Sequence, residues 1–100
     1  MRLTQDDIDN GYPSTWDGWP NPVSLAVERG TGSLCNANLK YGITVYGSYY
    51  RTYMMPSILV RFLNRFDKGE PVEPLEFELG APSTIHVQKF IRKTGDPNNG

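Results

Sequence analysis

The chain has 100 residues, with ten Lys and Arg residues against eleven Asp and Glu residues, and 38% of its residues are hydrophobic. This length allows one small domain and excludes two independent ones, and the near balance of charge removes the strongest indication of bulk nucleic-acid or membrane binding. The one cysteine excludes an internal disulfide and any site of clustered thiolates, which is typical of a reducing compartment. We find no apolar run of signal-peptide or membrane-spanning length, and we expect a cytoplasmic protein with no membrane partner.

The first third of the chain predicts two helices. Thr4 has the pattern of an N-cap and is followed by acidic residues, which indicates a short helix over residues 5–10. Asn21 precedes a proline in the same way and predicts a helix over residues 22–29, with Gly30 as its left-handed C-terminal residue.

The segment between these helices, residues 11–21, is rich in Gly and Pro and contains both tryptophans, Trp16 and Trp19. Two indoles in such a loop could contact a partner or fold back over a thin core as a lid. We favour the lid, because small domains need such cover.

The middle of the chain changes to the alternation and the Val, Ile, Thr and Tyr content that are typical of strands. We expect three strands, at residues 34–40, 42–46 and 49–54. The dipeptide Gly47-Ser48 suits a two-residue hairpin turn, and this turn would pair Tyr46 with Tyr49.

This register assigns the side chains of the hairpin to two faces. The face expected to cover the core carries Ile43, Val45, Tyr50, Thr52 and Met54. The opposite face carries Thr44, Tyr46, Tyr49, Arg51 and Tyr53. Binding surfaces are enriched in Tyr and Arg. We therefore predict a partner-binding surface on this face, with Trp16 and Trp19 at its border, formed by Tyr46, Tyr49, Arg51 and Tyr53. Cross-strand tyrosines also stabilise solvent-facing sheets, and residues 84–91 could cover this face instead.

The last third begins with the clearest element, an amphipathic helix over residues 57–67 whose five large apolar side chains should enter the core. Residues 74–79 alternate apolar and acidic residues and predict a fourth strand, whereas residues 84–91 fit a strand or a frayed helix. We expect an α+β fold in which a three- to four-stranded, mostly antiparallel sheet packs on the main helix, with the 22–29 helix beside it. This single domain would cover residues 1–92, with a flexible tail over residues 93–100.

Patterns that carry catalysis are missing from the sequence. His86 has no evident cysteine or serine partner, and Asp6, Asp7 and Asp9 lack the spacing and the glycine of a calcium loop. No phosphate-binding loop, paired metal-ligand motif or serine elbow is present. We therefore expect no enzyme activity, no cofactor and no metal site.

Several motifs resemble a group of short accessory proteins encoded by tailed bacteriophages and prophages. These motifs are T-Q-x-x-I-D-x-G from Thr4, N-P-V-x-L-A from Asn21, a Tyr-rich hairpin that ends at Met55-Pro56, and F-x-x-x-F-D-x-G-x-P-V-x-P-x-x-F-x-L from Phe62. The group often has a cysteine where this chain has Asn21, and the double-Trp loop is particular to this chain. The resemblance implies a phage origin. It also implies a non-enzymatic protein, such as an anti-CRISPR inhibitor of bacterial defence, that binds and occludes a host protein complex.

Two other functions stay open at the level of the sequence. In the first, tyrosines stack on the bases of a nucleic acid and four basic residues neutralise its phosphates: Lys40, Arg51, Arg61 and Arg65. In the second, a small homo-oligomer sequesters a nucleotide signal in a pocket between subunits. The sequence is otherwise compatible with a monomer.

Overall fold

The computed structural model describes residues 1–87 and has the expected α+β architecture. In chain order, its elements are β1 (Arg2–Leu3), α1 (Gln5–Asn10), α2 (Pro22–Thr31), β2 (Cys35–Asn38), β3 (Gly42–Val45), β4 (Tyr49–Tyr53), α3 (Ser57–Asp67), β5 (Leu75–Glu76) and β6 (Thr84–Val87). The domain end expected at residue 92, the tail expected at residues 93–100 and the last part of the 84–91 segment lie outside the described residues.

The strands form two antiparallel sheets. The larger sheet has the order β2-β3-β4-β6, and β1 pairs with β5 in a separate two-stranded sheet. The fourth strand of the larger sheet is therefore β6, and the prediction that residues 74–79 fill this place is wrong. Leu75 lies opposite the fully buried Leu3 instead, and the backbone N–H of Phe77 donates to Met1 O at 2.9 Å. The observed strand covers two of the six predicted residues, Leu75 and Glu76, and local alternation could not identify its partner.

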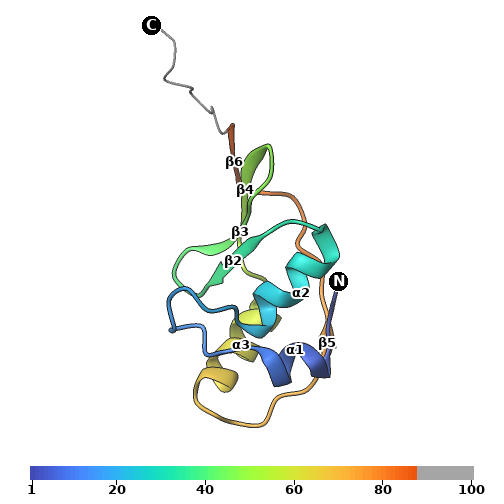
Figure 1. Cartoon of the computed structure of the whole chain (residues 1–100), viewed down its shortest axis with the longest axis vertical. Coiled ribbons are helices and arrows are strands. Elements are labelled where there is room, and N and C mark those ends of the chain that lie inside the picture. The colour runs from blue at the N-terminus through green and yellow to red at the C-terminus, as the bar shows by residue number, and fades with distance from the viewer. Residues whose placement is uncertain (88–100) are drawn as a thin grey trace, which may run out of the picture.

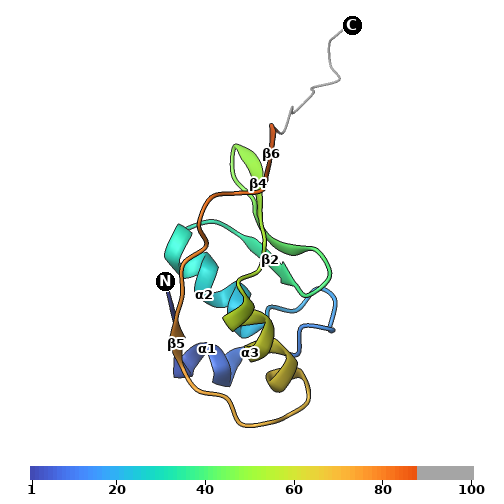
Figure 2. The same cartoon turned by 180° about the vertical axis from the view of Figure 1, so that it is seen from behind.

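The elements are distributed unevenly along the molecule. The three helices and the small β1-β5 sheet lie at one end, whereas the β3-β4 turn and β6 extend away from them (Figures 1 and 2). The 11–21 loop and the β2-β3 turn both lie toward the helical end. One end of the larger sheet is thus supported by helices, and the other projects into solvent.

Both predicted helix starts are confirmed. Thr4 caps α1, because its hydroxyl accepts from the Asp7 N–H at 3.3 Å and Asp7 Oδ2 accepts from the Thr4 N–H at 2.9 Å. Asn21 caps α2 in the same reciprocal way with Ser24, at 3.0 Å in each direction. These boxes satisfy N–H groups that the first helical turn leaves without partners.

The end of α2 differs from the prediction. Gly30 lies inside the helix, and Gly32, with φ of 74°, is the left-handed residue that ends it. The Gly32 N–H donates to Glu28 O at 2.8 Å and completes the last turn. A glycine inside a helix costs only about 1 kcal/mol, so the local signal at Gly30 was too weak to stop a helix that packs on the core.

An ion pair joins α1, α2 and β1. The Arg29 guanidinium contacts both carboxylate oxygens of Asp7 at 2.7 Å and also donates to Arg2 O at 2.7 Å. Burial raises the pKa of the Asp7 carboxyl, but the bonds from Arg29 and Thr4 outweigh it, and the net pKa lies below the ordinary value. Asp7 is therefore part of the packing between elements, not of an acidic ligand site.

The core lies between the helices and the inner side of the larger sheet. Its buried members are Leu3, Val23, Ala26, Val27, Ala37, Ile43, Val45, Leu59, Phe62, Leu63 and Phe77. The main helix, α3, buries three of its five large side chains, whereas Phe66 is half-buried and Ile58 is exposed. The expectation that all five are buried is wrong, because Ile58 and Phe66 lie in the first and last turns of the helix, on either side of the buried residues.

Candidate binding surface: the outer sheet face and the tryptophan groove

The register of the β3-β4 hairpin is one residue away from the predicted one. Ile43 pairs with Tyr53 and Val45 pairs with Arg51. One step further outward, this register sets Tyr46 opposite Tyr50, and their rings meet edge to face with centroids 4.9 Å apart. The predicted pairing of Tyr46 with Tyr49 is therefore wrong.

A shift of one residue moves every side chain of β4 to the other face. Tyr49, Arg51 and Tyr53 lie on the inner side together with Ile43 and Val45. The Arg51 guanidinium lies 5.7 Å from the Tyr49 ring centroid, and Tyr53 packs against the core. Apolar residues occur at both odd and even positions of β4, so alternation alone could not choose between the two registers.

The predicted surface of Tyr46, Tyr49, Arg51 and Tyr53 is consequently divided between two faces. Tyr46 alone of the four lies on the outer side of the sheet, opposite the core. Tyr50 and Thr52, which were expected in the core, lie on that outer side as well. A partner that contacts one face cannot reach all four predicted residues.

The outer side carries a continuous set of uncharged side chains, which we call the outer sheet face. We define it by six residues whose side chains the structure describes: Asn36, Thr44, Tyr46, Tyr50, Thr52 and Thr84. Four of them, Asn36, Thr44, Thr52 and Thr84, form one row across all four strands. All six are exposed or half-buried, and none carries a charge. The signal in the sequence was the recurrence of Thr at even positions in the two hairpin strands.

A groove of about 300 Å³, which we call the tryptophan groove, adjoins this face and is formed by the 11–21 loop, α2 and β2. Its lining includes both tryptophans, Trp16 and Trp19, two acidic residues, Asp17 and Glu28, and Asn36 of the outer sheet face. Since Asn36 belongs to both, the groove and the outer sheet face are continuous. Sequence reasoning missed the groove, because its walls come from three separate segments.

The 11–21 loop is tied to the rest of the molecule through Ser14 and is packed within itself through Tyr12. The Ser14 N–H donates to Asp67 Oδ1 at 2.8 Å and the Ser14 hydroxyl donates to Asp67 Oδ2, which ties the loop to the end of α3. The Tyr12 ring lies 4.9 Å from Trp19 and 5.6 Å from Trp16 between centroids. The loop is thus held while its indoles stay accessible.

The two indoles do not seal the core. Trp16 is 52% exposed and Trp19 is 56% exposed, and neither belongs to the core cluster. The interpretation of the loop as a lid is therefore wrong. The tryptophans border the outer sheet face through Asn36, and Tyr49, Arg51 and Tyr53 are not among the residues that line the groove.

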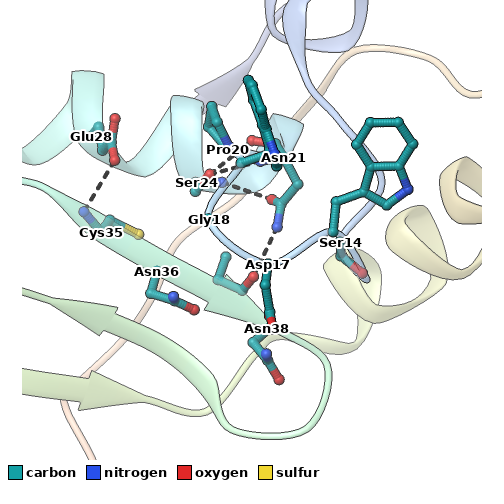
Figure 3. Close-up of a pocket in the computed structure, with 13 residues that line it drawn as sticks. Ser14, Asp17, Gly18, Pro20, Asn21, Ser24, Glu28, Cys35, Asn36 and Asn38 are labelled. Carbon is teal, nitrogen blue, oxygen red and sulfur yellow. Dashed lines mark hydrogen bonds between the residues drawn. The ribbon is translucent and has the colours of Figure 1, made fainter.

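One wall of the groove is formed where side chains of α2 and of its N-cap residue reach the free edge of β2. Glu28 Oε2 accepts from the Cys35 N–H at 3.2 Å, and Asn21 Nδ2 donates to Ala37 O at 2.8 Å (Figure 3). Both contacts satisfy backbone groups that an edge strand otherwise offers to another strand. The geometry therefore disfavours strand addition at β2 and leaves a rigid polar wall.

Cys35 also lines the groove, but its chemistry is that of an inert thiol. Burial, together with the negative charge of Glu28, raises its pKa to about 12. The reactive thiolate is therefore scarce at neutral pH. The side chain of His86 lies outside what the structure describes, and within the described part no group of three His, Cys, Asp or Glu side chains could hold a metal ion.

The four basic residues of the nucleic-acid hypothesis lie on different elements. Arg61 and Arg65 line a second cavity, of about 190 Å³, on α3. Lys40 lies in the β2-β3 turn, 5.3 Å from the Tyr41 ring centroid, and Arg51 is on the inner side of β4. The structure brings two of the four together and places none of them on the outer sheet face.

Among the described residues, no helix is long and apolar enough to cross a membrane. Comparisons of this chain with family models, with curated proteins and with solved structures found no match.

Proposed function

We propose that this chain is a non-enzymatic protein-binding domain that occludes part of a partner protein, docking through the outer sheet face with the tryptophan groove at its margin. One observation carries the proposal. A sheet face of six uncharged, accessible residues lies in a chain of which 21% of the residues are charged. Depletion of charge and enrichment of aromatic residues distinguish the centre of protein interfaces from ordinary surface.

The aromatic residues at this surface have the properties of binding anchors. Tyr46 and Tyr50 hold each other edge to face, so that docking orders few additional rotamers. Trp16 and Trp19 add large apolar area with an N–H donor on each ring. Residues of this kind supply most of the binding energy at characterised interfaces.

The sheet provides a rigid support for these anchors. The row of Asn36, Thr44, Thr52 and Thr84 is fixed by the pairing of four strands, and the hydroxyls of Thr44 and Thr52 lie 3.4 Å apart. A surface on paired strands keeps its shape on binding, and a preformed surface loses less entropy.

The resemblance to phage accessory proteins adds the finer part of the proposal. It favours a bacterial host complex as the partner, with inhibition of a defence system as the outcome. Nucleic-acid binding has less support, because the outer sheet face carries tyrosines but none of the four basic residues that would neutralise phosphates.

The experiment is affinity capture from bacterial lysate with matched charge variants. Thr52→Arg places a charge at the centre of the outer sheet face, whereas Asn64→Arg adds the same charge at an exposed position of α3. We expect wild type and Asn64→Arg to capture the same protein and Thr52→Arg to lose at least about tenfold in capture, since a desolvated unpaired charge costs more than 1.4 kcal/mol.

A parallel arm with nuclease distinguishes the alternative. Capture that disappears after nuclease treatment would identify a nucleic acid as the bound species. Equal capture by Thr52→Arg and Asn64→Arg, with both variants folded by circular dichroism, would place the contact elsewhere on the molecule.

A further inference from the structure

We propose that the tryptophan groove is a receptor site for an arginine side chain. Two kinds of lining residue suggest this ligand. The charged residues of the lining are Asp17 and Glu28, which are both acidic, and the aromatic residues are Trp16 and Trp19. A guanidinium can pair with carboxylates and stack on indoles at the same time.

The carboxylates have free capacity to accept hydrogen bonds. Glu28 uses Oε2 for the Cys35 N–H, and within residues 1–87 its Oε1 accepts no hydrogen bond. Asp17 likewise accepts none from the described part of the chain, and it lies in the exposed 11–21 loop. A cation in the groove would therefore find acceptors that no other group occupies.

Other ligand classes fit the groove less well. An anion would approach two carboxylates with no basic side chain in the lining to attract it. An apolar group would remove water from the Asp17 carboxylate and from Glu28 Oε1 and give them no hydrogen bond in exchange. Lysine would satisfy the charge, but its compact ammonium lacks the planar fork that stacks on an indole.

The groove is also preformed, which lowers the entropic cost of binding. Ser14 ties the 11–21 loop to Asp67 of α3. Asn21 and Glu28 fix the opposite wall of the groove to β2. The volume of about 300 Å³ lies at the lower end of the range of small-molecule pockets. A single long side chain suits this size better than a nucleotide does.

The inference rests on the proposed function only for the source of the arginine. The groove meets the outer sheet face at Asn36, so an arginine from a protein docked on that face would enter the groove at the margin of the interface. We infer that this side chain gives the interface its electrostatic specificity, whereas the uncharged face provides contact area.

The groove can be tested without the partner, because both tryptophans of the chain line it. Intrinsic fluorescence is therefore a direct readout of its occupancy. The probe is the blocked tripeptide acetyl-Gly-Arg-Gly-amide, titrated into the millimolar range. Its control is the same peptide with citrulline, which keeps the shape of arginine and removes the charge. We expect a saturable change with arginine and at least about tenfold weaker binding of citrulline.

Variants of the protein assign the acidic groups. Asp17→Asn and Glu28→Gln should each weaken binding of the arginine peptide several-fold, whereas Glu78→Gln, which removes the same charge from an exposed position outside the groove, should leave it unchanged. Asp17 makes no contact that the fold needs, so this variant stays informative if Glu28→Gln proves unstable. No saturable signal, equal binding of the citrulline peptide, or full binding by Asp17→Asn and a folded Glu28→Gln would overturn the inference.

The two proposals fail in different ways. Thr52→Arg should lose capture of the partner and still bind the arginine peptide. Partner capture that depends on Thr52, together with no binding of the peptide, would overturn the groove alone. Binding of the peptide together with capture that ignores Thr52→Arg would overturn the outer sheet face and leave the groove.

Discussion

The two faces of the larger sheet use the same strands for opposite purposes. On the inner side, Ala37, Ile43 and Val45 are buried under side chains of α2 and α3, and the helical end is fixed further by the Asp7–Arg29 ion pair. On the outer side, the neighbouring residues of the same strands stay accessible and carry no charge. Residues that stabilise the fold therefore alternate along each strand with residues of the proposed binding surface. A substitution on one face should affect stability or binding without affecting the other.

The largest expected change in the free energy of unfolding comes from a substitution on the inner face. Ile43→Ala removes a fully buried side chain and should lower the free energy of unfolding by about 2–5 kcal/mol. Thr44→Ala, one residue along the strand, should cost less than about 1 kcal/mol, because Thr44 faces the outer side. Urea unfolding of both variants measures the difference, and similar losses would contradict the assignment of faces.

The second prediction concerns the support at the helical end. Asp7→Asn removes the charge that pairs with Arg29 and should cost about 1–3 kcal/mol, because the neutral amide that replaces the buried carboxylate is a poorer acceptor for Arg29 and for the Thr4 N–H.

Acid should have a related effect. The pKa of Asp7 is lowered in the folded state, so its contribution is complete above the ordinary value of 3.8 and is lost as the pH falls through the lowered pKa. Unfolding measured between about pH 6 and pH 2 should therefore show a steeper acid loss for wild type than for Asp7→Asn. Parallel pH profiles would show that the pair contributes nothing.

A smaller energetic effect tests the register of the β3-β4 hairpin. The edge-to-face contact predicts a coupling of about 0.5–1.5 kcal/mol between Tyr46 and Tyr50 in a double-mutant cycle with alanine. The same cycle for Tyr46 and Tyr49 should give a coupling near zero, because these rings lie on opposite faces. The reverse result would restore the two-residue turn at Gly47-Ser48 and with it the predicted binding face.

The last prediction lies in the groove and concerns the rate of a reaction, with little effect on stability. The Cys35 thiol, with a pKa raised to about 12 by burial and by Glu28, should react slowly with iodoacetamide at pH 8. Unfolding in urea should speed labelling more than tenfold, since an exposed thiol has a pKa near 8.5. Mass spectrometry of the time course measures both rates. Equally fast labelling of the native protein would show that the wall of the groove opens readily.

The sequence predicted well wherever a signal was local. The caps at Thr4 and Asn21, the helix over residues 57–67 and the α+β class follow from contacts within a few residues, and all are confirmed. It predicted poorly wherever two distant segments had to be matched. Of the strand predicted over residues 74–79, Leu75 and Glu76 alone form a strand, and it pairs with β1 outside the larger sheet.

The candidate site shows the same division. Tyr46 and the two tryptophans were named from the sequence, and each lies at the proposed surface. Tyr49, Arg51 and Tyr53 were assigned to the wrong face, because a turn that is one residue longer reverses the facing of the whole strand. The acidic residues of the groove gave no signal, since Asp17 and Glu28 come to line one groove only after the loop, α2 and β2 have packed.

By itself, therefore, the sequence determined the helices, their N-terminal caps and the residue types available for binding, because helix formation depends on side chains three and four positions apart. Only the tertiary structure decided the register of the hairpin, the outer position of Tyr50 and Thr52, and the groove. Aromatic residues occupy both odd and even positions of β4, so local alternation does not select one register. In the observed register Tyr53 packs against the core, and this contact is a tertiary one that no local pattern encodes.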